Sequence, residues 1–168
     1  AKTIIDLASK LGEPGERFVI IEDTKELVCS AKNTVQIHAL ARDMLPIFTQ
    51  AAMRLRPDRV IVGEVRGREA YDLMYLLNSG HPGSFTTIHA NNCRLALHKF
   101  LMLARESGED VHPQRVVECF DLVVSIGRTP DGLRVEELSE VVGFENADFI
   151  VKPLNSTKRR AKNEKQKQ

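Results

Sequence analysis

The stretch Arg56-Pro57-Asp58-Arg59-Val60-Ile61-Val62-Gly63-Glu64-Val65-Arg66-Gly67 decides how this chain folds. Its β-branched run, Val60 to Val62, predicts a short buried strand, and the glycine and glutamate that follow mark a turn. In open α/β sheets, ligands bind beyond the carboxyl ends of the strands, so Glu64 is a candidate site residue. The simpler alternative is a strand followed by a solvated loop glutamate.

A second apolar run has the same form. Arg17 to Ile21 predicts a strand that ends in Glu22 and Asp23. Such continuous apolar runs are typical of parallel sheets that are buried on both faces. If the two strands are neighbours, Glu22 and Glu64 point into the same crevice.

Helical and strand periods alternate over the first two-thirds of the chain, and a β-meander follows. This order predicts an α/β fold with a largely parallel sheet. Asn91 and Asn92 are good N-cap residues for the fourth helix, and Asp131-Gly132 is a hairpin signal. The expected helices cover about 4–11, 42–56, 67–78, a segment after 92, and 113–120, and the further strands cover 34–38, 84–89, 122–126 and 133–135.

The helix expected over 42–56 carries an apolar stripe. Met44, Phe48, Ala51 and Leu55 recur at helical spacing, which predicts that they face the core. Pro46 falls in the first turn, where its missing amide donor matters little.

Composition indicates a soluble intracellular globular protein. Charged residues make up 28% of the 168 residues and hydrophobic ones 42%. Three cysteines without paired spacing predict no disulfide framework, and no apolar run approaches the ~18 residues of a membrane span. The net charge of +1 conceals six Lys or Arg and one Glu in the last eleven residues. We therefore expect one domain over 1–154 and a disordered basic tail over 155–168.

Four groups of residues occur in a fixed order that resembles a known family. They are Ile21 to Leu27, Met53 to Arg59, Gly63 to Gly67, and Gly80 to Gly83 continuing to Asn91. Together they are similar to the nucleotide-binding domain of the secretion ATPase superfamily, in its conjugative-transfer and type IV secretion branch. The resemblance implies a RecA-like P-loop NTPase core that uses ATP and Mg²⁺.

The resemblance also implies roles for three residues. Glu22 corresponds to the aspartate box, Glu64 to the atypical Walker B motif and His89 to the histidine box. Phosphoryl transfer to water depends on positioning and charge stabilisation. One glutamate would orient or deprotonate the water and the other would hold the Mg²⁺ shell. His89 would sense the γ-phosphate or orient Glu64.

Lys2-Thr3 resembles the end of a P-loop, in which the lysine binds phosphate oxygens and the hydroxyl binds Mg²⁺. Ala1 stands where the last glycine of that motif belongs. Either the chain is cut inside the P-loop, and its first strand is missing as well, or this segment has lost the motif.

The resemblance further favours Arg54 and Arg56 as nucleotide-contacting or intersubunit residues, since arginine suits phosphate recognition. His81, His89 and Cys93 raise the alternative of a zinc site, although their spacing is irregular.

The expected function is therefore an ATPase that powers conjugative DNA transfer, type IV secretion or pilus assembly. It would act as a homo-oligomeric ring, a hexamer, with inner-membrane secretion components as partners. It would be cytoplasmic and peripheral to that membrane, and would touch nucleic acid only indirectly. The alternatives are a non-hydrolysing assembly module, because the P-loop is incomplete, and a nucleic-acid-binding protein that uses the basic tail.

Overall fold

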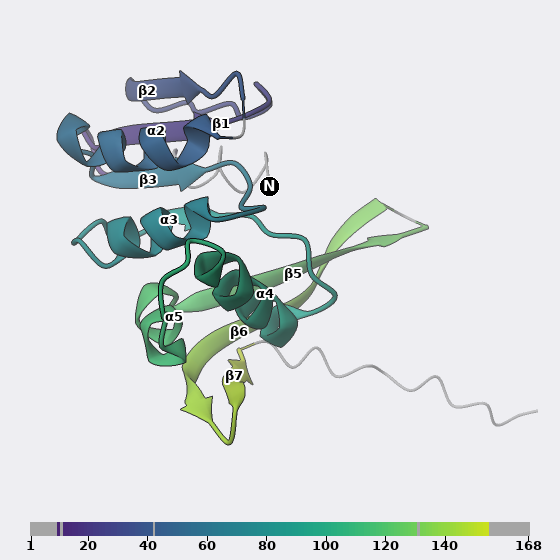
Figure 1. Cartoon of the computed structure of the whole chain (residues 1–168). Helices are drawn as coiled ribbons and strands as arrows, with labels where there is room; N and C mark the ends of the chain where they lie inside the picture. Colours follow the sequence, from purple (N-terminus) through teal and green to yellow (C-terminus); the bar gives the residue numbers. More distant parts are fainter. Residues whose placement is uncertain (1–9, 11, 42, 131, 155–168) are drawn as a thin grey trace, which may run out of the picture.

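A computed structural model describes residues 10, 12–41, 43–130 and 132–154 (Figure 1). Lys2, Thr3, most of the helix expected over 4–11 and the tail 155–168 lie outside the described residues. The described chain forms a parallel sheet, four α-helices and a separate antiparallel sheet. The predicted α/β class with a C-terminal β-meander is confirmed.

The parallel sheet has the strand order β2-β1-β3-β4. It places β1, which ends in Glu22, beside β3, which is followed by Glu64, because Ile21 of β1 is in register with Val62 of β3. The strands are β1 (Arg17–Glu22), β2 (Asn33–His38), β3 (Arg59–Val62) and β4 (Phe85–Thr86).

Both faces of the parallel sheet are covered, which explains the continuous apolar runs of β1 and β3. On one face, side chains of β1 and β3 such as Val19 and Val60 join the main core with residues of α2 and α3. On the other face, Phe18, Ile20 and Ile61 pack with Leu27 from the loop after β1.

The helix expected over 42–56 is shorter and faces the sheet differently. It consists of α2 (Met44–Ala52) and a 3₁₀ turn, η1 (Met53–Leu55). The predicted stripe was wrong in two positions, since Met44 and Ala51 are exposed. The helix has apolar side chains on most sides, so the spacing of apolar residues alone does not predict which face is buried. Thr49 can lie in the core because its hydroxyl donates to the carbonyl of Leu45 at 2.8 Å. The buried residues are Leu45, Pro46, Thr49 and Ala52.

Three further helices complete the core. They are α3 (Glu69–Leu77), α4 (Cys93–Arg105) and α5 (Pro113–Cys119). The bounds predicted for α3 and α5 are correct to within two residues. Asn92 caps α4 as expected, with its side-chain oxygen accepting from the amide of Leu95 at 2.8 Å. In α4 the residues Leu97, Phe100 and Ala104 face the core.

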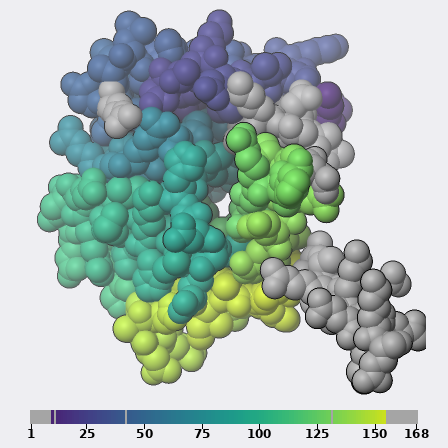
Figure 2. Space-filling model, turned by 90° about the vertical axis from the view of Figure 1, so that its right-hand side faces the viewer, coloured from purple at the N-terminus to yellow at the C-terminus, as the bar shows by residue number. Residues whose placement is uncertain are grey.

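The antiparallel sheet has the order β5-β6-β7 and packs on α4 and α5. Its strands are β5 (Leu122–Thr129), β6 (Gly132–Glu145) and β7 (Asp148–Pro153). The hairpin signal is confirmed by the pairing of Thr129 with Gly132, although Asp131 itself is not described. In Figure 2 the green residues of this hairpin lie on the face turned to the viewer, above the yellow residues of β7.

The strand expected over 84–89 is reduced to two residues. Beyond Thr86 the ladder stops, but the chain stays beside the end of β3 through single bonds. The hydroxyl of Thr87 donates to the carbonyl of Gly63 at 2.6 Å, and the carbonyl of Thr87 accepts from the amide of Val65 at 2.9 Å. These bonds carry the chain from β4 toward Glu64.

Candidate functional site

The carboxyl ends of β1 and β3 meet at one edge of the parallel sheet. The amide of Gly63 donates to the carbonyl of Ile21 at 2.8 Å. A Cβ atom on Gly63 would lie 3.2 Å from the Cβ of Glu22, so a glycine lets the two strand ends approach this closely. The two predicted glutamates therefore lie at the carboxyl ends of adjacent strands, at the edge where open α/β sheets bind ligands.

The carboxylate of Glu64 is held by two side chains. Its Oε2 accepts from the guanidinium of Arg66, and its Oε1 lies 3.2 Å from Nε2 of His89. The side chain of Glu64 is 16% exposed, whereas that of His89 is 86% exposed. The structure thus brings together two residues that lie 25 positions apart in the sequence, at the edge where β1 and β3 end.

Arg66 links the ends of β3 and β1. Its second terminal nitrogen, Nη1, lies 3.5 Å from Oδ2 of Asp23, the residue that follows β1. The hydrogen bond to Glu64 raises the pKa of Arg66 above its ordinary value, with the charges of Glu64 and Asp23 contributing to the shift. Arg66 is therefore a fixed positive charge between two carboxylates.

Glu22 is placed differently from Glu64, because its carboxylate is enclosed by the protein. The residue is 3% exposed. Its Oε2 accepts from the backbone amides of Glu26 and Leu27 at 2.8 and 2.9 Å, and its Oε1 accepts from Gln36 at 3.4 Å. These three hydrogen bonds satisfy the carboxylate of Glu22 within the protein. Glu22 thus fixes the loop that follows β1.

The three zinc candidates do not form one group. His89 lies beside Glu64, and His81 lines a pocket at the opposite, amino edge of the sheet. Cys93 is buried at the start of α4, and burial raises the pKa of its thiol to about 11. Among the described residues, no group of three or more His, Cys, Asp or Glu side chains is arranged to hold a metal ion.

Arg54 and Arg56 lie away from Glu64. Both precede β3, so they sit at the amino edge of the sheet, and both are exposed. The chain from Arg59 to Glu64 spans roughly 17 Å at about 3.3 Å per extended residue. Within one copy, the fold does not bring these arginines to the edge that carries Glu64.

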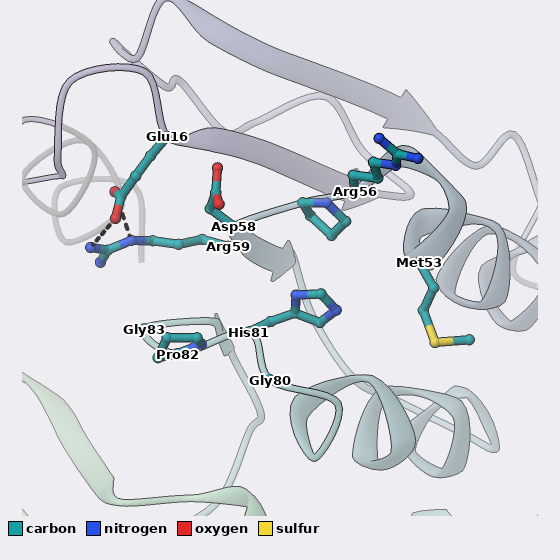
Figure 3. Close-up of a pocket in the computed structure, with 10 residues that line it drawn as sticks. Glu16, Met53, Arg56, Asp58, Arg59, Gly80, His81, Pro82 and Gly83 are labelled. Atoms are coloured by element: carbon teal, nitrogen blue, oxygen red, sulfur yellow. Dashed lines mark hydrogen bonds and ion pairs between the residues drawn. The ribbon is translucent and has the colours of Figure 1, made fainter.

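Arg56 lines a pocket of about 600 Å³ at this amino edge, between the Arg56–Arg59 segment and the Gly80–Gly83 loop (Figure 3). The charged groups on one side of the pocket neutralise each other, since Arg59 donates to both carboxylate oxygens of Glu16 at 3.0 Å. Because the pocket lies at the amino edge of the sheet, it is distinct from the edge that carries Glu64. It is lined by Glu16, Met53, Arg56, Pro57, Asp58, Arg59, Gly80, His81, Pro82 and Gly83.

Two acidic residues of the site carry weak signals in the sequence. Asp23 follows Glu22 at the end of the same apolar run, and nothing in the sequence distinguishes its role from that of Glu22. Glu69 is 5% exposed, and its Oε1 accepts from the amides of Arg66 at 2.7 Å and of Gly67 at 3.0 Å. An acid in the first turn of a helix, two residues after a glycine, is the feature that could have indicated Glu69.

Residues 2–128 match the family model described as Type II/IV secretion system protein. The chain belongs to this family. It is 41% identical over 136 residues to the conjugal transfer protein TrbB of Rhizobium radiobacter, covering 81% of this chain and 42% of that protein. It is 33% identical over 135 residues to the type IV secretion system protein VirB11 of Bartonella quintana, covering 73% of this chain and 38% of that protein.

Among solved structures, the fold is similar to that of the VirB11 ATPase from the Brucella suis type IV secretion system in complex with sulphate. The TM-score is 0.74 at 24% identity, covering 83% of this chain and 44% of that one. This likeness confirms the secretion-family fold. The chain thus spans less than half the length of these relatives. No helix in the described ranges is both long enough and apolar enough to cross a membrane.

Proposed function

We propose that this chain is part of an ATPase whose hydrolysis of ATP drives conjugative DNA transfer, type IV secretion or pilus assembly. Residues 1–154 form its ATPase domain. The observation that carries the proposal is the carboxylate of Glu64, held by Arg66 and His89 at the carboxyl end of β3. Relatives named for conjugal transfer and type IV secretion support the biological setting.

In this proposal Glu64 orients the attacking water. Its side chain is fixed on both oxygens yet remains partly exposed, so a water molecule can approach it. His89 is the most exposed member of the group, and its Nε2, 3.2 Å from Oε1 of Glu64, would orient that carboxylate or sense the γ-phosphate. Its backbone is held by Lys99, whose Nζ donates to the His89 carbonyl at 2.7 Å.

Glu22 has a supporting role. Because both of its oxygens accept bonds inside the protein, it shapes the loop that carries Asp23 rather than approaching the water. Asp23 would offer a carboxylate oxygen, the kind of ligand that Mg²⁺ prefers. When bound, Mg²⁺ would offset negative charge on the phosphates. Lys2 and Thr3, which we propose for phosphate and Mg²⁺ contacts, lie outside the described residues.

The working form is a homo-oligomeric ring, a hexamer, at the cytoplasmic side of the inner membrane, with secretion components of that membrane as partners. Arg54 and Arg56 lie at the edge opposite Glu64 and would reach a nucleotide only in a neighbouring copy. Arginines supplied by a neighbour stabilise charge in phosphoryl-transfer transition states.

The test is phosphate release from Mg-ATP by the full-length protein and its Glu64→Gln variant. The substitution keeps the shape of the side chain but removes the charge that orients water, so we expect turnover to fall by about 100-fold or more. Glu140→Gln on the exposed part of β6 is the matched control and should retain turnover. Equal turnover of Glu64→Gln and the parent protein, or no turnover by the parent, would refute the proposal.

A further inference from the structure

Glu69 is a buried carboxylate that the proposed hydrolysis does not use directly. It is the first residue of α3, and it is 5% exposed. A buried carboxylate is costly unless hydrogen bonds compensate it. Here the compensation is specific, because one oxygen, Oε1, accepts from two consecutive backbone amides, those of Arg66 at 2.7 Å and of Gly67 at 3.0 Å.

These two amides belong to the loop that connects β3 to α3. A Cβ atom on Gly67 would lie 3.1 Å from Oε2 of Glu69, so the glycine lets the carboxylate fold back closely over the loop. Arg66 itself is exposed, so burial of its own side chain does not fix it. The backbone amide of Arg66 is instead held from the protein interior, by Glu69.

The side chain of Arg66 connects this loop to the candidate site. One nitrogen of its guanidinium donates to Oε2 of Glu64, and the other lies 3.5 Å from Asp23. Because the guanidinium is a planar fork, its reach toward both carboxylates depends on the position of its backbone. Glu69, the Arg66 backbone, the Arg66 guanidinium and Glu64 thus form a continuous chain of contacts.

We propose that Glu69 is a positioning residue for Glu64, acting through Arg66. The inference rests on the proposed role of Glu64 in ATP hydrolysis. Glu69 accepts the hydrogen bonds that hold the loop, and the loop fixes the backbone of Arg66. The guanidinium of Arg66 then holds the carboxylate of Glu64. The role predicts opposite chemical requirements at the two glutamates: Glu64 needs its negative charge, whereas Glu69 needs only a carbonyl-type oxygen at Oε1.

The experiment compares turnover of Mg-ATP by the full-length protein with substitutions along this chain. Glu69→Ala releases both amides and lets the loop move, and a shift of about 1 Å at a catalytic group can cost about 100-fold in rate. We expect kcat to fall by about tenfold or more and KM for ATP to change by less than about threefold, since the loss is in positioning. Arg66→Met should give the same change.

Glu69→Gln provides the rescue by a conservative variant. The amide keeps an oxygen at Oε1, so turnover should stay within about threefold of the parent protein, although a charge-assisted bond is roughly twice as strong as a neutral one. The double variant Glu69→Ala with Arg66→Met should be no slower than either single variant, because both break the same chain of contacts. The control is Glu106→Ala, which removes an exposed carboxylate near Gly67 and should retain turnover.

The outcomes separate this inference from the proposed function. If the parent protein is active and Glu64→Gln is not, but Glu69→Ala or Arg66→Met retains full kcat, the positioning role is wrong. It is also wrong if Glu69→Gln is as slow as Glu69→Ala, since the charge would then be the requirement. Should Glu69→Ala fail to fold, Arg66→Met and Glu69→Gln decide the question, because Arg66 is exposed and glutamine preserves the buried contacts.

Discussion

Gly83 shows how one residue controls an ion pair at the amino edge of the sheet. Its φ of +73° is a conformation that residues with a Cβ rarely adopt, and a Cβ at this position would lie 2.7 Å from Nη1 of Arg59. Arg59 is the residue that donates to both oxygens of Glu16 and also lies over the ring of Phe18. The glycine therefore makes room for the guanidinium.

We predict that Gly83→Ala destabilises the protein more than Gly80→Ala. Both positions have positive φ, so both variants should lose roughly 1–2 kcal/mol from the backbone. A Cβ at position 80 would meet no atom within 4 Å, whereas the alanine at 83 would displace Arg59. The urea midpoints of the two variants test this. Equal midpoints would show that Arg59 moves aside without loss.

A second residue-scale prediction concerns the cap of α4. The side chain of Asn92 accepts from the amide of Leu95, so Asn92→Ala should cost about 1 kcal/mol of unfolding free energy. Asn91→Ala is the matched control, because Asn91 precedes the cap and is exposed. Thermal unfolding of both variants should show a loss for Asn92→Ala alone. A loss of the same size for Asn91→Ala would contradict the capping role.

At the scale of elements, α4 and β7 are joined by a polar cluster. Asp148, at the start of β7, accepts from His98 at 2.7 Å and from Arg94, both on α4. The ring of His98 also lies against Phe149, with ring centroids 4.9 Å apart. The hydrogen bond from His98, followed by the contact with Arg94, holds the pKa of Asp148 below its ordinary value.

A lowered carboxylate pKa gives the cluster a defined pH dependence. The contribution of Asp148 to stability is present above its ordinary pKa of 3.8 and is lost as pH falls through the lower pKa of the folded state. Asp148→Asn should therefore lower the unfolding temperature at about pH 6 and have a smaller effect at about pH 3. The exposed Asp110→Asn is the control. An effect of Asp148→Asn that does not change with pH would contradict the charge-based account.

At the scale of the whole molecule, the two edges of the parallel sheet carry different groups. Glu64 and His89 lie at the carboxyl edge, and Arg54 and Arg56 lie at the amino edge. If the arginines act on the nucleotide of a neighbouring copy, Arg56→Glu and Glu64→Gln should each reduce ATP turnover. A mixture of the two variants should then regain turnover, because some interfaces combine an intact Glu64 with an intact Arg56.

The control for this mixing experiment is a pair of variants at the same edge. Glu64→Gln mixed with His89→Ala should regain nothing, since each copy then lacks one member of the same group. If the mixture of Arg56→Glu and Glu64→Gln is no more active than the separate variants, Arg56 does not act on the nucleotide of a neighbouring copy.

Several features of the fold follow from sequence alone because they depend on local chemistry. The apolar runs of β1 and β3 predict buried parallel strands, and Asn92 predicts a helix start that the structure confirms. The buried face of α2 could not be predicted. Its apolar side chains lie on all sides, and the sheet beneath it selects Leu45 and Ala52 rather than Met44 and Ala51.

The sequence by itself determined that Glu22 and Glu64 close two buried strands and that the chain resembles a family of secretion ATPases. Only the tertiary structure decided how the two glutamates differ. Strand pairing puts them at one edge, but the loop after β1 encloses Glu22, while Arg66 and His89 hold a partly exposed Glu64. These differences arise from contacts between segments far apart in the chain, and a local pattern of residues does not specify such contacts.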